Sequence, residues 1–289
     1  MNKTKLGPRS TAVPDAPAGE EIVGDQSVPE APSRIWRIVR DLTRWLAPIV
    51  AFVILWEIVG RFGPFSRTLL PPATRIGEAT WKLYSTGDIL PDIGISVKRA
   101  ATGFTVASVI GLTLGLLIGH FEVFNRFLAP LFELFRQLSP LALLPLFVLF
   151  LGLGFHSQVA IIAWAAVWPI LLNTISGARQ IEPSLLKAAR SLGANRSQIF
   201  TKVVLPYAVP TIATGLRLGG TYALLVLVAA EMVGGNSGLG YRIIQSQYLY
   251  RIPQMYAFIV TTAVLGLVVN LLLVSFETRM TRWKQDLKP

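Results

Sequence analysis

Long stretches without a charged side chain constrain this chain more than any other feature of its sequence. Ala100–Phe121 and Ile252–Phe276 contain no Asp, Glu, Lys or Arg, and Gln137–Ala178 lacks them over 42 residues. A spanning helix needs about 20 mostly apolar residues, because the hydrocarbon layer is about 30 Å thick and each helical residue rises about 1.5 Å. Only 15% of the 289 residues are charged, against about 25% in a soluble domain. We therefore expect an integral membrane protein built of helices.

The apolar runs predict six spanning helices. The 42-residue run is too long for one crossing and is expected to divide at the segment Gly152–His156. The predicted spans are Trp45–Gly60 with Glu57 inside it, Ala100–Phe121, the two halves of Gln137–Ala178, Val209–Val233 and Ile252–Phe276. The predicted fold class is all-α, with five of the six transmembrane helices in a core region, residues 100–277.

The distribution of Lys and Arg predicts the orientation of the chain. Cytoplasmic loops of membrane proteins carry an excess of these residues. With a cytoplasmic N-terminus, the inner segments hold 18 Lys and Arg, and the outer segments hold eight. We therefore expect both termini in the cytoplasm. The family resemblance described below further implies the plasma (inner) membrane of a prokaryote. In this orientation the cytoplasmic loops, which carry most of the excess positive charge, face anionic lipid. The net charge of +11 therefore does not indicate a nucleic acid partner.

The segments outside the core are expected to differ in order. Residues 1–33 contain five prolines and no apolar period, which is typical of a disordered tail. Residues 34–99 are expected to hold an amphipathic lead-in, the first span and an outer connection, in which Trp81 and Tyr84 indicate a helix along the membrane surface. Residues 278–289 are predicted to be a cytoplasmic tail.

Small residues and prolines predict how the spans pack. In the second span, small residues recur at every fourth position, namely Gly103, Ala107, Gly111, Gly115 and Gly119. This pattern favours close packing against a neighbouring helix, with a role in gating as the alternative. Three prolines in the third and fourth spans, Pro140, Pro145 and Pro169, predict bends. Bends around a pathway and plain kinks in a packed bundle remain equally open.

The segment Gly177–Pro206, between the fourth and fifth spans, is polar and basic but patterned. Glu182 and Pro183 are typical of the start of a helix. Leucines and alanines then give that helix an apolar face, and Gly193 is expected to end it. The first half of the segment is therefore predicted to be a short amphipathic helix at the cytoplasmic surface.

The second half of this segment predicts a second short helix. Either Asn195 or Ser197 is expected to cap its start, and the helix is expected to end at Leu205-Pro206. Such a helix-turn-helix could read DNA, lie on the membrane or dock a soluble partner. The residues alone leave these three interpretations open.

The loop resembles a known family. The string Lys187-Ala188-Ala189, followed at fixed distances by Gly193 and Val203-Val204-Leu205-Pro206, is similar to the EAA loop of importer-type ABC transporter permeases. In that pattern Glu-Ala-Ala is followed by Gly and then by Ile-x-Leu-Pro, so the chain departs from it at Lys187 and Val203. The strings LSPLALLPLFVLFLGLG, WPILLNTISGAR, GLRLGG and AAEMVGGNSGLGY resemble the branch that imports nitrate, bicarbonate, taurine and alkanesulfonates.

The resemblance implies a fold, partners and a mechanism. The fold would be that of a type I ABC importer permease, with a coupling helix between helices 4 and 5. The permease would form a homodimer and work with two cytoplasmic ATPase subunits, which bind ATP and Mg²⁺, and with an extracytoplasmic substrate-binding protein. The residues then expected to couple to the ATPase are Glu182, Lys187, Ala188, Ala189, Leu192, Gly193, Ala194, Val203, Leu205 and Pro206.

The substrate implied by the resemblance is a small anion. Taurine or another sulfonate is the first choice, with nitrate, bicarbonate or another small solute as the alternative. Polar residues within the spans are candidates for the pathway, since charges there are costly. They are Arg217 and Glu231, which share one face of the fifth span, with the neutral residues Ser139, Asn173, Thr174, Thr221 and Tyr222. The alternative is that each polar residue pairs with another helix or extends to the interface. Glu57 is expected to pair with a neighbouring basic group rather than to bind substrate.

Several other classes of function are disfavoured. The chain has no Cys and two His, so a metal site or thiol catalysis is not expected. No Gly-Lys dipeptide occurs, so a phosphate-binding Walker A loop is not expected either. Gly234–Gly240 is Gly-rich, but it follows a membrane helix, so a dinucleotide-binding loop is not expected. We expect that this segment either contacts the binding protein or forms a flexible turn. An ion-coupled carrier would show internal repeats and midplane carboxylate pairs, which we do not find.

Overall fold

The computed structural model describes residues 34–64, 66 and 68–285, with side chains for 47–64, 66, 68–124 and 126–281. The predicted disordered tail, residues 1–33, lies outside the described residues. The described residues divide into two units between Ala51 and Phe52. The helix α1 (Arg34–Phe62) begins in the first unit, contains Pro48 and ends in the second.

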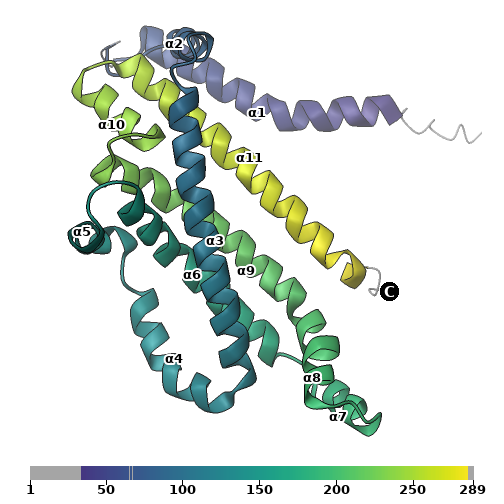
Figure 1. The fold of residues 1–289 in the computed structure, drawn as a ribbon. Coiled ribbons are helices and arrows are strands. Elements are labelled where there is room, and N and C mark those ends of the chain that lie inside the picture. The colour runs from purple at the N-terminus through teal and green to yellow at the C-terminus, as the bar shows by residue number, and fades with distance from the viewer. Residues whose placement is uncertain (1–33, 65, 67, 286–289) are drawn as a thin grey trace, which may run out of the picture. The chain divides into compact units, whose positions relative to one another are not determined.

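The second unit is helical throughout its described part, as predicted (Figure 1). After α1 its elements are α2 (Ala73–Ser85), α3 (Leu90–His120), α4 (Glu122–Arg136), α5 (Pro140–Leu151), α6 (Phe155–Arg179), α7 (Pro183–Ser191), α8 (Arg196–Ile199), the π-helical segment η1 (Phe200–Val204), α9 (Leu205–Gly234), α10 (Leu239–Tyr248) and α11 (Ile252–Gln285). Four helices in the described residues are long and apolar enough to cross a membrane, namely α3, α6, the continuous helix Arg196–Gly234 and α11.

The small residues of α3 pack closely against α6, as predicted. A Cβ added at any of four glycines would lie under 3.0 Å from a side chain of α6. The contacts are Gly103 with Ile162, Gly111 with Ile170, Gly115 with Thr174 and Gly119 with Ala178. The two residues of every pair are 59 positions apart in the sequence. The two helices therefore run parallel and in register, and their backbones approach closely because glycine has no side chain.

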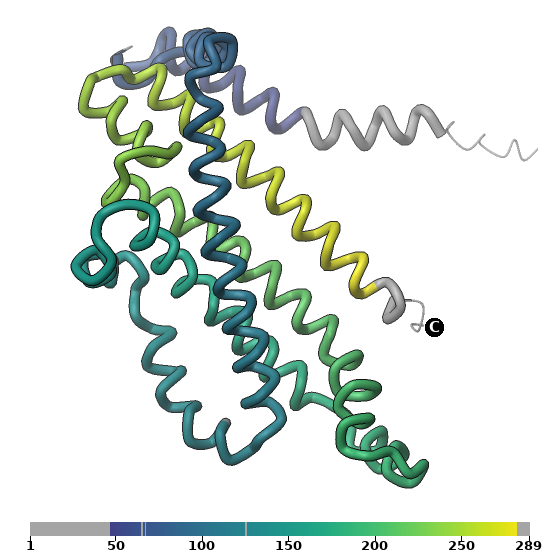
Figure 2. The backbone as a smooth tube through the Cα atoms, viewed as in Figure 1, coloured from purple at the N-terminus to yellow at the C-terminus, as the bar shows by residue number. Residues whose placement is uncertain are grey.

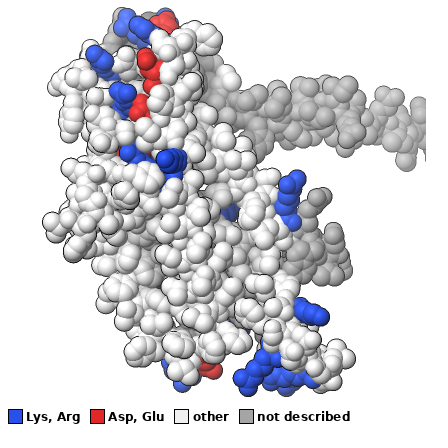
Figure 3. Space-filling view, in the orientation of Figure 1, with Lys and Arg blue, Asp and Glu red and all other residues white. Residues whose placement is uncertain are grey.

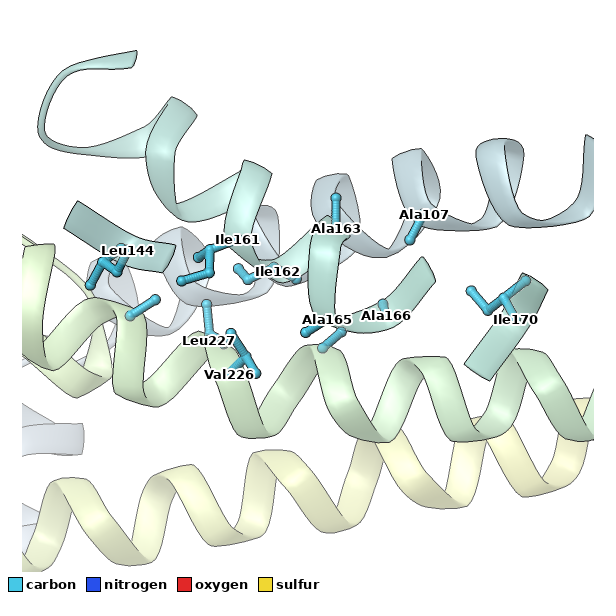
Figure 4. Packing of buried hydrophobic residues seen from close by; sticks show 12 residues of the cluster. Ala107, Leu144, Ile161, Ile162, Ala163, Ala165, Ala166, Ile170, Val226 and Leu227 are labelled. Atoms are coloured by element: carbon cyan, nitrogen blue, oxygen red, sulfur yellow. The ribbon is translucent and has the colours of Figure 1, made fainter. Parts of the chain in front are cut away.

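The main hydrophobic core lies where α3, α6 and α9 meet (Figures 2 and 4). Ala107 of α3, Ile161, Ile162 and Ile170 of α6, and Leu227 of α9 are fully or almost fully buried there. Gly215 and Gly219 of α9 receive Asn173 and Ile170 of α6 in the same way. The helix α6 is thus packed against small residues of two neighbours, and Ile170 contacts both of them.

The third predicted span is not a single crossing helix, which corrects the sequence prediction. The run from Gln137 gives only the 12-residue helix α5, about 18 Å long at 1.5 Å per residue. The preceding helix α4 meets it at an angle of 94°. Ser139, directly before Pro140, has extended backbone angles (φ −63°, ψ 124°), because proline disfavours the helical conformation of the residue before it. The pair α4–α5 is a broken span or a re-entrant turn, and the count of six stays a prediction.

Other boundaries shift as well. The break between the third and fourth spans falls where it was predicted, with Gly152 and Gly154 at φ +76° and +115°. The helix α3 begins at Leu90, ten residues before the predicted span, because the charges of Asp92 and Arg99 are paired inside the fold rather than placed in a loop. The predicted surface helix around Trp81 and Tyr84 is α2, and both aromatic side chains are exposed.

Candidate functional site

The loop between α6 and α9 is packed against the helices that flank it. The helix α7 begins as predicted, with Glu182 as its N-cap residue and Pro183 in its first turn. Leu186 and Phe200 pack on the buried residues Ala178 and Val204. Since Ala178 belongs to α6 and Val204 leads directly into α9, one apolar cluster joins the loop to both helices. Movement of α7 would therefore be transmitted to α6 and α9.

Gly193 ends α7 in a conformation that favours glycine. Its φ is +78°, and its N–H donates to the carbonyl of Arg190 at 2.9 Å, while the N–H of Ala194 donates to the carbonyl of Ala189 at 3.1 Å. These two bonds form a Schellman motif. The motif requires a left-handed backbone conformation at Gly193, which residues with a side chain adopt only at a cost. A Cβ at Gly193 would meet no atom within 4 Å. Backbone conformation, rather than space, thus explains the glycine.

The second helix of the loop starts as predicted but does not end where we expected. Asn195, not Ser197, caps it, in a reciprocal capping box with Gln198. The predicted end at Leu205-Pro206 is wrong, since α8 continues through η1 into α9 as one helix. A proline inside a helix clashes with the carbonyl four residues earlier. The wider π-helical turn directly before Pro206 relieves that clash.

The surface of this loop is exposed and basic. Arg179, Lys187, Arg190, Arg196 and Lys202 are all exposed, and within the described part of the chain none of the five forms an ion pair. Figure 3 shows Lys and Arg gathered at the end of the bundle that holds α7 and α8, which we call the α7 end. Leu192 is 88% exposed beside Gly193. The other predicted coupling residues are exposed (Ala188, Pro206) or half-buried (Ala189, Ala194, Val203, Leu205).

Glu231 lies at the opposite end, near α10, and is fully buried in a charged network. Its carboxylate accepts hydrogen bonds from the Ser96 hydroxyl at 2.9 Å, from Arg99 Nη1 at 2.8 Å and from the backbone N–H of Gly240 at 3.0 Å. Arg99 is 3% exposed and also donates to the carbonyl and hydroxyl of Ser237. The network therefore joins α3, the end of α9 and the start of α10.

A second ion pair extends this network. Asp92 of α3 accepts a hydrogen bond from Arg242 Nε of α10 at 2.7 Å and one from the N–H of Gly238 at 3.0 Å. The Gly-rich segment 234–240 is consequently held against α3, and Gly234, Gly238 and Gly240 are buried. Sequence analysis missed Asp92, Ser96 and Arg99, because they precede the uncharged run. Their spacing of three and four residues, which places them on one helix face, was the available signal.

Arg217 does not share a site with Glu231, although both lie on α9. Its guanidinium donates to Glu277 of α11 at 3.0 Å, and Thr214 donates to the other carboxylate oxygen. The side chain of Arg217 remains 42% exposed. Each of the two predicted pathway charges is thus paired with another helix, which is the alternative that the sequence left open. Glu57 pairs with Arg61, as expected.

The neutral candidates divide into exposed and buried groups. Ser139, Thr221 and Tyr222 are exposed, and Tyr222 lies on a stripe of α9 that this protomer leaves uncovered. Thr174 is fully buried against Gly115, and its hydroxyl donates to the carbonyl of Ile170. Asn173 donates to the carbonyl of Pro169 and lies at the contact with Gly215. Thr174 and Glu231 are thus fully buried within the chain.

The described residues form a bundle of long apolar helices with an exposed basic loop between α6 and α9, and comparison with known proteins gives the class and the family. The chain belongs to the family of binding-protein-dependent transport system inner membrane components, whose model matches residues 89–282. It is a multi-pass membrane subunit of the ABC importer type, and its relatives are permease subunits rather than enzymes.

The relatives confirm the branch that the sequence strings indicated. The putative aliphatic sulfonates transport permease protein SsuC of Bacillus subtilis is 33% identical over 241 residues, 83% of this chain and 87% of that protein. The nitrate import permease protein NrtB of Synechocystis is 32% identical over 239 residues, 80% and 86% of the two chains. Permeases named for taurine and bicarbonate transport also match.

Solved structures confirm the fold. An inward-facing structure of the MetNI methionine ABC transporter aligns with a TM-score of 0.59 at 20% identity, covering 66% of this chain and 95% of that one. The architecture is therefore that of an ABC importer permease.

Proposed function

We propose that this chain forms the membrane pathway of an ATP-driven importer for a small anion and that the loop between α6 and α9 couples it to a separate ATPase. The observation that carries the proposal is the construction of that loop. The short helix α7 is exposed and basic on its outer surface, ends in a glycine-dependent turn and is fixed to α6 and α9 by one apolar cluster. A helix of this kind can be held by a soluble partner and displaced as a rigid body.

The partner supplies the energy in this proposal. No Gly-Lys dipeptide occurs in the chain, so ATP and Mg²⁺ bind to two cytoplasmic ATPase subunits and not to the permease. Closure of the ATPase pair around ATP shifts α7. The helices α6 and α9 share the apolar cluster of Ala178 and Val204 with the loop, so they tilt when α7 moves. Their tilting opens the pathway alternately to the two sides of the membrane.

The pathway lies between two copies of the chain. The side chains of Leu218, Tyr222, Leu225 and Val233 form an apolar stripe along α9 that the described part of the protomer leaves exposed. Exposed Leu149, Phe150 and Leu153 lie at and beyond the end of α5, which packs on α9. A second copy placed against this surface gives the homodimer that we propose.

The substrate is proposed to be taurine or another sulfonate, and nitrate or bicarbonate is an equally consistent choice. The relatives with these names support a small anion. The 42% exposure of Arg217 leaves its guanidinium accessible to a solute despite its pairing with Glu277. Thr221, Thr262 and Asn270 line a cavity of about 670 Å³ between α9 and α11 and offer neutral hydrogen-bonding groups. The ion-paired Glu231 belongs to the same lining.

The orientation follows from the loop. The α7 end is proposed to face the cytoplasm with both termini, and the end that holds α2 and α10, here called the α10 end, to face the binding protein outside. The excess of Lys and Arg in the segments assigned to the cytoplasm supports this orientation.

Reconstitution tests the proposal. The chain is co-expressed with an ATPase and a binding protein from the same cell, and ATP-driven uptake of taurine, an alkanesulfonate, nitrate and bicarbonate is measured in proteoliposomes. We expect uptake of one anion class that requires all three components. Transport by the purified chain alone, without ATP, would contradict the proposal.

A further inference from the structure

Two buried side chains, one of them in the network of Glu231, carry polar atoms that have no hydrogen-bond partner within the described residues. The atoms are Nε of Arg99 and both amide atoms, Oε1 and Nε2, of Gln158. Arg99 is 3% exposed and Gln158 is fully buried. Native proteins leave very few buried polar atoms without a partner, because such an atom has lost its hydrogen bonds to water and gained none in return. The three atoms therefore need a partner that these helices do not supply.

The contact between α3 and α6 brings these two side chains to the same level. Gly103 of α3 faces Ile162 of α6, and the two are 59 positions apart. The same spacing holds at the three further glycine contacts along these helices. Arg99 and Gln158 are also 59 positions apart, and each precedes its member of the first pair by four residues, about one helical turn. Gln158 thus lies at the level of Arg99 along the α3–α6 contact.

The contact between α6 and α9 brings Glu231 to this level as well. The two helices run in opposite directions, and Ile170 of α6 contacts Gly219 of α9. Gln158 precedes Ile170 by 12 residues, and Glu231 follows Gly219 by 12 residues, so both lie about 18 Å from that contact in the same direction along the bundle. Because Gln158 is fully buried, its amide lies inside the bundle at the level of the ion pair Arg99–Glu231.

The guanidinium of Arg99 is held in place by its other nitrogen atoms. Nη1 donates to Glu231 Oε1 at 2.8 Å and to the carbonyl of Ser237 at 2.7 Å, and Nη2 donates to the Ser237 hydroxyl at 2.9 Å. Since a guanidinium is planar, these bonds also fix the direction in which Nε donates. A direct bond from Nε to Gln158 would satisfy Oε1 but leave Nε2 without a partner. Small molecules between the two side chains can satisfy all three atoms.

We propose that internal water occupies the site between Arg99 and Gln158 and links α6 to the buried network. Nε of Arg99 can only donate, whereas the amide of Gln158 offers both a donor and an acceptor. Water accepts the hydrogen bonds from Nε and Nε2 and donates to Oε1. Buried waters typically form about three hydrogen bonds with groups of this kind. The bridge joins α6 to α3, α9 and α10, which the network of Glu231 already connects.

Water fits this site better than an ion does. An anion only accepts hydrogen bonds, so it would leave the amide oxygen without a donor, and a metal cation would be repelled by Arg99. The buried charges are already balanced, since Arg99 pairs with Glu231 and Arg242 pairs with Asp92. A route for water also reaches the network, because Glu231 belongs to the lining of the cavity of about 670 Å³ between α9 and α11.

The sign of one stability change tests the water bridge. Gln158→Met removes the amide and keeps a side chain of similar length. If water links Gln158 to Arg99, the change leaves Nε unsatisfied and should lower the melting temperature of the purified protein by about 3–6 °C. If Gln158 has no partner, the same change removes a buried polar group that destabilises the fold, and the melting temperature should rise. A rise, or no change, would overturn the proposal.

A second background separates the bridge from a loss of packing. Arg99→Lys keeps a positive charge beside Glu231 but has no Nε. In this background Gln158→Met should lower the melting temperature by less than half as much, because the bridge is already broken. Equal losses in the two backgrounds would mean that the methionine only packs poorly, and the water bridge would then be wrong.

A structure of the purified protein at a resolution that shows ordered water identifies the occupant. We expect density for water within about 3 Å of both Arg99 Nε and Gln158 Oε1. Direct contact between Nε and Oε1, or an ion at this position, would overturn the proposal. None of these measurements requires an ATPase or a substrate, so their failure would leave the proposed function standing.

Discussion

At the end of α9 that carries Glu231, the charged side chains Glu231 and Arg99 are buried and form an ion pair, whereas at its beginning the charged side chains are exposed and form no ion pairs within the described residues. Glu231 is inaccessible and accepts bonds from α3 and from the start of α10. The loop before the same helix carries four exposed basic side chains, those of Lys187, Arg190, Arg196 and Lys202. One end is built to hold neighbouring elements in place, and the other presents a surface to a partner.

Arg217 lies between these two extremes. Sequence analysis treated it together with Glu231, because both are intramembrane charges on one helix face. In the structure the pair Arg99–Glu231 is 3% and 0% exposed, and the pair Arg217–Glu277 is 42% and 17% exposed. Exposure therefore separates the two pairs, and a charge in a spanning helix does not by itself mark a pathway.

The largest expected effect is the loss of stability on breaking the buried ion pair Arg99–Glu231. Glu231→Ala leaves Arg99 buried without its carboxylate, which typically costs about 3–5 kcal/mol. The matched variant Glu277→Ala removes a partly exposed partner and should cost about 1 kcal/mol or less. Thermal melting of the purified protein measures both changes. Equal losses of stability for the two variants would contradict the distinction between the buried pair Arg99–Glu231 and the partly exposed pair Arg217–Glu277.

The second effect sharpens the role of the loop. Gly193→Val forces a β-branched residue into the left-handed region, at a cost of about 1–3 kcal/mol in this turn. Membrane insertion should survive, because the change lies outside the spans, but substrate-stimulated ATP hydrolysis should be lost. Gly193→Asn, which tolerates this conformation, serves as the control and should retain most of the stimulation. Normal coupling in the valine variant would show that the turn is not needed.

A third change examines the intermediate charge. Arg217→Ala should lower the rate of anion uptake about tenfold, while the amount of assembled complex stays the same, because the exposed guanidinium no longer attracts the solute. Arg217→Lys keeps the charge and should recover part of the rate. Uptake by the alanine variant at the natural rate would make Arg217 a purely structural residue.

The smallest effect is expected at Lys187, where the family pattern has Glu. Lys187→Glu should weaken binding of this chain's own ATPase by up to about fivefold, since exposed ion pairs contribute at most about 1 kcal/mol. The loss should shrink at high salt. Tighter binding of the variant, measured by titration of the ATPase, would argue against an acidic docking surface on that subunit.

Sequence patterns predicted the features that depend on local chemistry. The glycines of α3, the break at Gly152 and Gly154, the start of α7 and the turn at Gly193 all follow from periodicity or backbone preference, and the structure confirms them. The apolar runs located the four long apolar helices. They did not predict the bend at Ser139-Pro140, because hydropathy gives no information on the direction of a helix axis.

Features that depend on distant residues were not predictable in this way. Asp92, Ser96 and Arg99 meet Glu231 and Arg242 more than 130 positions further along the chain. Nothing in a single sequence indicates that such charges are paired. The continuation of α8 into α9 was also missed, since proline usually ends a helix unless a π-helical turn precedes it.

The central claim is that α7 is held on the cytoplasmic side by an ATPase. Because the chain has no Cys, Leu192→Cys introduces a single thiol at the most exposed leucine of the loop. An impermeant maleimide should leave this thiol unlabelled in intact cells and label it in inside-out vesicles, and added ATPase subunit should protect it. Labelling from outside intact cells, or labelling that the ATPase does not affect, would contradict the account.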